Sequence, residues 1–389
     1  MKNEKDASNN TFLIIGAGPA GLLAGIELSK LGFGIQIIER HAKQIRPVCG
    51  EYLTPQGKDL LLKLGLSSTL VGFDQINGMT LYSPSQVKVV TTFPGNSSGV
   101  AIDRNLFQER LASEFIKLGG VIHYGHELEF IKDNDGQYEV KTNSGNFTSK
   151  YLLGADGRQS KTAKLLDMKI VAPTEKKIAI HCYLTPKKSI GKNGQMHILG
   201  EGSYIGINPI SDVLVNFSIV TDANAIKNAG GMKELLNFWL EQNLSLKEQF
   251  NLITDEEIKT ASPLNRNAID IAKGNCALIG DASGFIDPLT GEGITTAIKT
   301  VSLLTNLIRE QHNVIKAFEI YGLRRKKDFS EKEKLNKAFQ QIIKLPVPCE
   351  VIAHFLNIST HIRDTFIGVI GNIYSPKEGL LALLTQKRF

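Results

Sequence analysis

The sequence is poor in cysteine and tryptophan, with four cysteines and a single tryptophan among 389 residues. None of the cysteines lies at a CxxC or Cys/His spacing, which excludes a zinc ribbon and a dithiol redox motif. They are Cys49, Cys182, Cys276 and Cys349. Free thiols, together with a polar N-terminus that has no signal-peptide core, predict a cytoplasmic protein.

The sequence also lacks a high net charge and long runs of apolar residues. The net charge is only +6, and no RNA- or DNA-binding motif accompanies it, so we expect no nucleic-acid partner. No apolar run approaches the length of a membrane span. The densest basic run, residues 324–327, is interpreted as a solvated helix face, with contact to an anionic membrane surface as the alternative. No carboxylate completes a metal site near the histidines, so we expect no metal.

The N-terminal part predicts a strand, a glycine turn, a helix, a second strand and an acid. The apolar run FLII (12–15) leads into the turn, and the second strand, IQIIE, ends at Glu39. The turn reads Gly16-Ala17-Gly18-Pro19-Ala20-Gly21. In such a unit Gly16 permits the tight turn, Gly18 lets the backbone approach a pyrophosphate, and Gly21 lets the helix pack on the strand. We therefore predict a dinucleotide site.

The acid at the end of the second strand narrows the choice of dinucleotide. The carboxylate of Glu39 can accept hydrogen bonds from ribose hydroxyls, while the positive end of the helix dipole faces the phosphates. An acid here, in place of an arginine, favours an unphosphorylated ribose, as in FAD or NAD.

Two later segments resemble parts of a known family. YLLGADGRQS (151–160) and IGDASGFIDPLTGEGITTA (279–297) each begin with a short apolar strand and continue into a glycine-containing turn. With the first glycine turn, their order and spacing resemble the two-domain FAD-dependent family that includes p-hydroxybenzoate hydroxylase-like aromatic hydroxylases and geranylgeranyl reductases. The resemblance covers most of residues 10–310 and implies FAD as the cofactor.

The resemblance also implies roles for individual residues. Asp281, after Gly280, would bind the ribityl chain, Pro288 would lie near the flavin ring, and Gly291, Gly293 and Ile294 would face its N1/O2 edge. Helix-terminal N–H groups there would stabilise the negative charge of reduced flavin. Asp156 and Gly157 would lie near the pyrophosphate, Arg104 would close over FAD, and Arg40 follows the ribose acid. Asp287 and Glu292 are interpreted as turn residues that point into water.

A cysteine follows the second strand, in the segment RPVCGEYLTPQG (46–57). This segment resembles the Cys-Gly segment of geranylgeranyl reductases, although Glu51 stands where that branch has a glycine. At a helix start the thiol of Cys49 could have a lowered pKa and act as proton donor or redox partner. The alternative is a small buried thiol that only packs, and this is the interpretation for the other three cysteines.

The pattern changes between the second and third motifs. Four segments with alternating or β-branched residues predict an antiparallel sheet: 178–184, 195–199, 204–210 and 213–220. In the family such a sheet covers the flavin, and substrate lies between; the candidate lining residues are His181, Tyr183, His197, Tyr204 and Asn208.

The predicted fold class is α/β. We expect a Rossmann-type FAD-binding domain with an inserted antiparallel β-sheet substrate domain and a helical C-terminal region. The boundaries are 10–75, 100–175 and 265–314 for the FAD-binding domain, 76–99 and 176–264 for the substrate domain, and 315–389 for the C-terminal region.

The sequence leaves the reaction open. The first hypothesis is an NAD(P)H-dependent monooxygenase acting on a phenolic or polyketide-like molecule, because the cysteine segment is only a partial match. The alternative is a geranylgeranyl-reductase-like enzyme that reduces isoprenoid double bonds with Cys49 as proton donor, and a further alternative is a non-catalytic FAD-binding protein. No second GxGxxG unit is present, so NAD(P)H would bind only transiently. A lipophilic substrate would favour contact with a membrane surface; the oligomeric state is left open.

Overall fold

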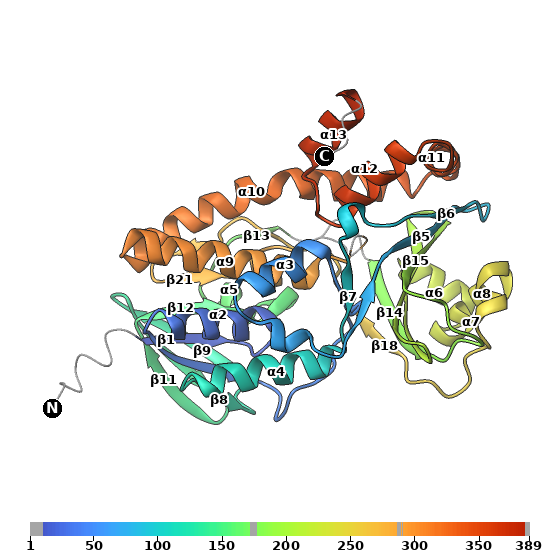
Figure 1. Ribbon diagram of the computed structural model, residues 1–389. Helices are drawn as coiled ribbons and strands as arrows, with labels where there is room; N and C mark the ends of the chain where they lie inside the picture. The colour runs from blue at the N-terminus through green and yellow to red at the C-terminus, as the bar shows by residue number, and fades with distance from the viewer. Residues whose placement is uncertain (1–10, 172–176, 286–288, 290, 386–389) are drawn as a thin grey trace.

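The structure consists of two β-sheet lobes joined side by side and a set of C-terminal helices that run along both (Figure 1). It is a computed structural model that describes residues 11–171, 177–285, 289 and 291–385. The described chain ends lie on different parts of the molecule, the first at the sheet of the N-terminal lobe and the second at the end of α13, among the C-terminal helices.

A six-stranded sheet forms the first lobe, in the order β20-β21-β12-β1-β2-β8. Its strands are β1 (Thr11–Ile15), β2 (Gly34–Glu39), β8 (Val121–Tyr124), β12 (Tyr151–Gly154), β20 (Ala272–Lys273) and β21 (Cys276–Leu278). All neighbours from β21 to β8 are parallel, and Ile14 of β1 lies between Leu153 and Ile37. The carboxyl ends of these strands therefore meet at one edge, where ligands bind in open parallel sheets.

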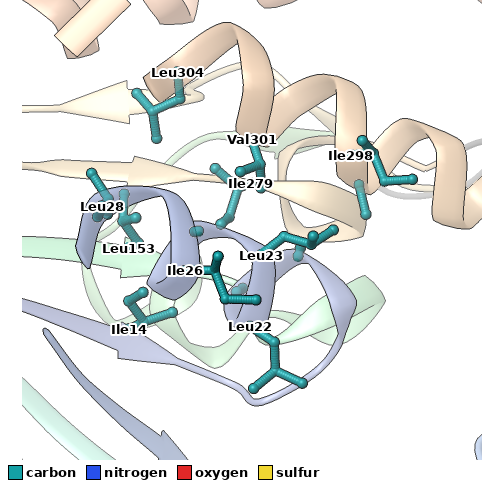
Figure 2. Packing of buried hydrophobic residues seen from close by; sticks show 14 of the residues in the cluster. Ile14, Leu22, Leu23, Ile26, Leu28, Leu153, Ile279, Ile298, Val301 and Leu304 are labelled. Carbon is teal, nitrogen blue, oxygen red and sulfur yellow. The ribbon is translucent and has the colours of Figure 1, made fainter. Parts of the chain in front are cut away.

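Helices cover one face of this sheet and bury its main core. They are α2 (Pro19–Lys30), α3 (Pro55–Lys63), α4 (Arg104–Lys117) and α9 (Gly293–Gln311). Figure 2 shows Leu23 of α2 on the side of the helix that faces Ile298 and Val301 of α9, and Leu22 and Ile26 of α2 belong to the same buried cluster. The opposite face is covered by an antiparallel three-stranded sheet of β9 (Leu128–Asn134), β10 (Gln137–Thr142) and β11 (Gly145–Ser149), and by α5 (Lys161–Leu165).

A seven-stranded sheet forms the second lobe, in the order β18-β14-β17-β16-β15-β5-β6. Its strands are β5 (Gly78–Tyr82), β6 (Lys88–Val90), β14 (Lys177–Leu184), β15 (Asn193–Gly200), β16 (Ser203–Ser211), β17 (Leu214–Asp222) and β18 (Lys259–Ala261). One face packs on α6 (Ala223–Ala229), α7 (Met232–Gln242) and α8 (Leu244–Gln249). Because side chains alternate along a strand, Ile180 and Cys182 enter that core while Ala179 and His181 lie on the other face.

Two small sheets complete the strand pairing. An antiparallel sheet of β3 (Tyr52–Leu53), β7 (Gly99–Ala101) and β4 (Asp74–Ile76) lies where the two lobes meet, and β13 (Ile170–Val171) pairs with β19 (Asn267–Ala268).

The C-terminal region is mainly helical up to Thr385, the last residue described there. Its helices are α10 (Val314–Ile342), α11 (Pro346–Ile358), α12 (Thr360–Ile370) and α13 (Pro376–Thr385). Proline lacks a backbone N–H and suits the first helical position, which is where Pro346 begins α11. In the described part of the chain, no helix is long and apolar enough to cross a membrane.

The predicted fold class is confirmed, with one difference in the second sheet. We expected it to be antiparallel throughout, but β5 pairs with β15 in parallel, Met79 opposite Gly194. The segment of β5 and β6 therefore joins the sheet at the end opposite β18, where β6 is the edge strand.

Candidate active site

The three glycines of the first turn differ in what a side chain at each would meet. A Cβ on Gly16 would lie 2.7 Å from the carbonyl oxygen of Ala155, and one on Gly21 would lie 1.9 Å from the carbonyl oxygen of Gly16. At Gly18, which caps α2, a Cβ would meet nothing within 4 Å. The backbone of the strand–helix turn is therefore tightly packed at Gly16 and Gly21, whereas the space beside Gly18 is free of atoms from the other described residues. Pro19 and Ala20, both buried, form the first turn of α2.

Glu39 fixes this turn through its carboxylate. One oxygen accepts a hydrogen bond from the N–H of Ala17 at 2.9 Å, and the other accepts one from the N–H of His41 at 3.0 Å. Each oxygen keeps a lone pair for a further donor. The next residue, Arg40, is exposed, and its Nε donates to the ring of His41.

The second and third motifs meet beside the first. Gly280 approaches α2 so closely that a Cβ on it would lie 2.7 Å from the Cβ of Ala20. Asp281 follows in a short 3-10 helix (Gly280–Ser283). Burial raises the pKa of Asp281, and the nearby guanidinium groups of Arg158 and Arg104 oppose that rise.

Asp156 holds the second motif in place through one of its two carboxylate oxygens. Its Oδ2 accepts hydrogen bonds from the N–H and the hydroxyl of Thr162, while its Oδ1 is buried without a partner among the described residues. Gly157 follows with φ +74° and open space around its Cβ position.

The glycine-rich end of the third motif opens α9. Gly291 has φ +67°, and a Cβ on it would lie 2.8 Å from the ring of Tyr52. Gly293 is the first residue of α9, and a Cβ there would meet nothing within 4 Å, whereas the Ile294 side chain is buried. Pro288 and Asp287 lie outside the described residues.

Glu292, which was expected to point into water, does not. Its side chain is 12% exposed and forms an ion pair of 2.8 Å with Lys332 of α10. It also accepts a hydrogen bond from Asn372 at 2.7 Å. The expectation is wrong because α10 and the segment after α12 pack against this turn.

A cavity of 650 Å³ lies between the two lobes and the C-terminal helices. Nine of the residues expected to bind FAD or to take part in the reaction line it: Arg40, Cys49, Arg104, Asp156, Gly157, Asp281, Gly291, Gly293 and Ile294. Seven others form the adjoining turns without lining it: Gly16, Gly18, Pro19, Ala20, Gly21, Glu39 and Gly280. The turns that contain these sixteen residues, from Gly16 to Ile294, therefore line or adjoin one cavity.

Cys49 lines this cavity from a loop and does not begin a helix. The loop runs from the end of β2 to β3, and α3 begins six residues later, at Pro55. Burial raises the pKa of the Cys49 thiol, and Glu51 and Asp281 raise it further, while Arg104 opposes them. The expectation of a lowered pKa is wrong because desolvation of the thiolate outweighs the nearby arginine. At neutral pH the group is a thiol.

Glu51 organises the same loop, and the sequence interpretation missed its role. Its side chain is wholly buried and its backbone has φ +52°, a conformation that few residues other than glycine adopt. The carboxylate accepts hydrogen bonds from Arg46 Nε at 2.9 Å, from the N–H of Arg104 at 3.1 Å and from Asn216 Nδ2 at 3.0 Å. It therefore ties the loop to α4 and to β17. The available signal was an acid inside the Cys-Gly segment with an arginine five residues before it.

The second lobe adds polar side chains to the cavity beside Cys49. Asn208 donates to the carbonyl oxygen of Glu51 at 2.7 Å, and Asn216 donates to that of Cys49 at 2.7 Å. The Oδ1 of Asn208 is buried without a partner in the described part of the chain. Of the five residues expected to line a substrate site, Tyr204 and Asn208 line the cavity.

The other three candidates lie behind the cavity wall. His181 is 2% exposed, and its ring packs edge-on against Tyr183. Arg46 also lies over the Tyr183 ring, 4.3 Å from its centroid. His197 is buried and stacks on Tyr82 at 4.2 Å. Within the described residues, no three His, Cys, Asp or Glu side chains are placed to hold a metal ion.

The cavity becomes apolar away from Cys49. Its far part is lined by side chains of β5, β6, α10, α11 and α12, among them Leu81, Val89, Ile342, Cys349, Ile352, Ala353, Leu356 and Phe366. A polar end with a thiol and an apolar extension thus belong to one continuous space.

The residues present fit FAD. The open backbone at Gly18 and Gly293 lies at the amino ends of α2 and α9, where N–H groups favour negative charge. Gly16 to Gly21 would hold the pyrophosphate, Glu39 a ribose, and Asp281 the ribityl chain. The unpartnered Oδ1 of Asp156 offers a further acceptor on the cavity wall.

Comparison with known proteins agrees with this fit. The FAD binding domain family matches residues 10–313. The chain is 25% identical over 302 residues to the digeranylgeranylglycerophospholipid reductase of Thermoplasma acidophilum, covering 74% of each chain. It is 24% identical over 375 residues to the reductase of the same name from Methanocella arvoryzae, covering 93% of this chain and 91% of the relative.

Flavoproteins that catalyse a different reaction share this fold. A flavin-dependent brominase aligns with a TM-score of 0.78 at 18% identity, over 96% of this chain and 98% of the other. The fold therefore does not decide the reaction, which must be argued from the site.

Proposed function

This chain belongs to the FAD binding domain family and is an FAD-dependent oxidoreductase, and we propose that it reduces carbon–carbon double bonds in the isoprenoid chain of a lipid. The proposal reverses the order of the two chemistries that the sequence left open. The observation that carries it is the cavity, which leads from Cys49 into an apolar space between the second sheet and α11.

An apolar extension of this kind suits a long hydrocarbon chain. Burying such a chain contributes about 0.8 kcal/mol for each CH₂ group, and the wall offers aliphatic side chains such as Leu81, Ile352 and Leu356. The relatives named as reductases of a geranylgeranyl lipid support the same substrate class.

Cys49 is suited to donate a proton. Reduced FAD, when bound, supplies a hydride to one carbon of the double bond. The other carbon then needs a proton, and the raised pKa of Cys49 keeps its thiol protonated at neutral pH. Arg104, which stabilises the thiolate left behind, limits the cost of that transfer. Solvent protons restore the thiol.

Glu51 and the two asparagines would position this proton donor. Asn216 holds the carbonyl oxygen of Cys49, and the N–H of Glu51 donates to its Sγ at 3.4 Å. The loop is thereby fixed against both lobes before substrate binds, which is how a reacting group gains effective concentration.

An external donor must reduce the FAD, and we propose NAD(P)H in that role. The absence of a second nucleotide-binding unit in the sequence implies transient contact at the cavity mouth, where Arg40 and Arg158 are lining residues. Anaerobic bleaching of the flavin absorbance by NADH or NADPH tests this part separately from the reduction of substrate.

The experiment compares two cysteines that both line the cavity, Cys49 in the loop before β3 and Cys349 in α11. With a geranylgeranyl lipid and chemically reduced enzyme under anaerobic conditions, Cys49→Ser should lower turnover about 100-fold or more while FAD stays bound. Cys349→Ser, at the apolar end, should keep turnover within about twofold. Equal turnover in wild type and Cys49→Ser would remove Cys49 from the reaction. Lack of any reduced product in all three proteins would contradict the proposed function.

A further inference from the structure

The helix α11 carries apolar side chains on two opposite faces. Its inner face, with Cys349, Ala353 and Leu356, lines the apolar end of the cavity. Its outer face carries Val347, Val351, Phe355 and Ile358, spaced by three or four residues so that they form one stripe. We call these four residues the α11 stripe. A helix with one apolar stripe toward the core and a second toward solvent suits an apolar environment on both sides; the exposed polar side chains of His354 and Asn357 lie along the outer surface as well.

The α11 stripe is strongly exposed. Its side chains are 72%, 49%, 57% and 81% exposed in chain order, and Leu345, just before the helix, is 56% exposed. The single acidic residue of α11, Glu350, turns away from the stripe to bind Ser83 and the N–H of Ser85. Figure 1 shows α11 at the periphery of the molecule, next to β6.

From this arrangement we infer that the α11 stripe docks on the surface of a lipid bilayer, which places the apolar end of the cavity against the membrane. The inference rests on the proposed function in one respect, because a lipid substrate resides in the bilayer. A single helix, α11, then separates the lipids of the bilayer from the cavity that receives the isoprenoid chain.

The size of the stripe favours a bilayer over a second copy of the chain. A helix of 13 residues is about 20 Å long and about 10 Å wide, which gives an outer face on the order of 200 Å². A stable protein interface buries about 800 Å² on each partner. A short apolar helix face next to cations is instead the pattern of an interfacial membrane anchor.

Exposed cations lie on the helix that precedes α11 in the chain. Lys334 and Lys337 are exposed in the last three turns of α10, the helix that leads directly into α11. The phosphate groups of an anionic bilayer attract such side chains, each by about 1 kcal/mol near the surface. The proposed surface therefore combines insertion of apolar side chains with attraction to anionic headgroups.

Vesicle binding by the full-length FAD-loaded protein tests the inference. The probes are vesicles of phosphatidylcholine with one quarter phosphatidylglycerol and vesicles of phosphatidylcholine alone. The variant Val351→Ser/Phe355→Ser/Ile358→Ser should bind the mixed vesicles at least tenfold more weakly than wild type. The matched control, Val213→Ser/Phe238→Ser/Leu244→Ser, removes three exposed apolar side chains from the second lobe and should bind like wild type.

A second measurement does not depend on comparing affinities. Phe355→Trp places an indole in the stripe, and the native Trp239 on α7 serves as internal reference. Lipids brominated on the acyl chain should quench the fluorescence added at position 355 and leave that of Trp239 unchanged. Unquenched fluorescence, or equal binding by wild type and the stripe variant, would overturn the inference.

The outcomes separate this inference from the proposed function. If vesicles bind through the stripe but no isoprenoid is reduced, the function fails and the docking surface stands. If detergent-dispersed lipid is reduced but vesicles do not bind, the docking surface fails and the function stands. A dimer in sedimentation that is lost in the stripe variant, with no vesicle binding, would assign the stripe to a second copy and overturn the inference.

Discussion

The guanidinium of Arg46 and the carboxylate of Glu51 form an ion pair of 2.9 Å at the junction of the two lobes. Glu51 is wholly buried, whereas Arg46 is 26% exposed and also pairs with Asp103 at 3.0 Å. The partners are therefore not equivalent, because only one of them would be left as a buried charge when the pair is broken.

That asymmetry predicts different costs for the two partners. Arg46→Met leaves the carboxylate with two neutral donors and should lower the free energy of unfolding by about 3 kcal/mol. Glu51→Gln leaves Arg46 paired with Asp103 and should cost about 1 kcal/mol. The urea midpoints of the two variants measure the difference. Equal midpoints, or a larger loss in Glu51→Gln, would contradict the assignment.

Two glycines of the first turn should separate FAD binding from folding. Gly18→Ala adds a Cβ in open space, so the FAD-free protein should melt within about 2 °C of wild type, while FAD binds at least about tenfold more weakly. Gly21→Ala places a Cβ 1.9 Å from a carbonyl oxygen and should destabilise the FAD-free protein by about 3 kcal/mol. Thermal melts and FAD titrations of both variants provide the test. Normal FAD affinity in Gly18→Ala would place the pyrophosphate elsewhere.

The raised pKa of Cys49 predicts slow alkylation at neutral pH. Since the thiolate is the reactive form, iodoacetamide should modify Cys49 more slowly than a free cysteine at about pH 7.5, and the rate should still rise above about pH 9. Arg104→Gln removes a cation that lowers this pKa, so alkylation of Cys49 at about pH 8.5 should become slower still. Peptide mass mapping distinguishes Cys49 from the other cysteines. Faster alkylation in Arg104→Gln would reverse the electrostatic account.

His181 predicts loss of stability in mild acid. Burial lowers its pKa from the ordinary value of 6.5 to about 4, and the cations of Arg46 and Lys259 add to this. The unfolded chain takes up the proton at about pH 6.5 and the folded chain only at about pH 4, so protonation favours unfolding between these values. His181 thus costs on the order of 3 kcal/mol of stability as the pH falls through that window. His181→Gln should flatten the decline in urea midpoint from about pH 6.5 to about pH 4, and His354→Gln, on the exposed face of α11, is the control. An unchanged slope in His181→Gln would show that the ring is not desolvated.

The sequence predicted those parts of the fold that depend on local pattern. The strand predicted at 178–184 is found at Lys177–Leu184, and the one predicted at 213–220 is found at Leu214–Asp222. Both carry alternating β-branched or aromatic residues, which favour strands wherever they lie in the chain. The parallel pairing of β5 with β15 could not be predicted in this way, because it joins segments more than one hundred residues apart.

The site residues show the same division. The family resemblance implied nine residues that the structure gathers around one cavity, but the environment of individual side chains followed from tertiary contacts. From the sequence, Glu51 is only an acid in a polar segment, and its burial depends on contacts with β17 and α4. Glu292 is only a turn residue in the sequence, and its ion pair depends on Lys332 of α10. The pKa of Cys49 could not be deduced either, since burial by two lobes outweighs the charge of Arg104.

The most direct test of the central claim is the mass of the product that the wild-type enzyme forms from a geranylgeranyl lipid, with and without oxygen. With an excess chemical reductant supplying the two electrons, the account predicts that each turnover adds two hydrogens to the isoprenoid chain without oxygen, and that the product formed in air gains the same two hydrogens and no oxygen atom. A product that gains an oxygen atom in air, with no product when oxygen is removed, would contradict reduction and make the enzyme a monooxygenase.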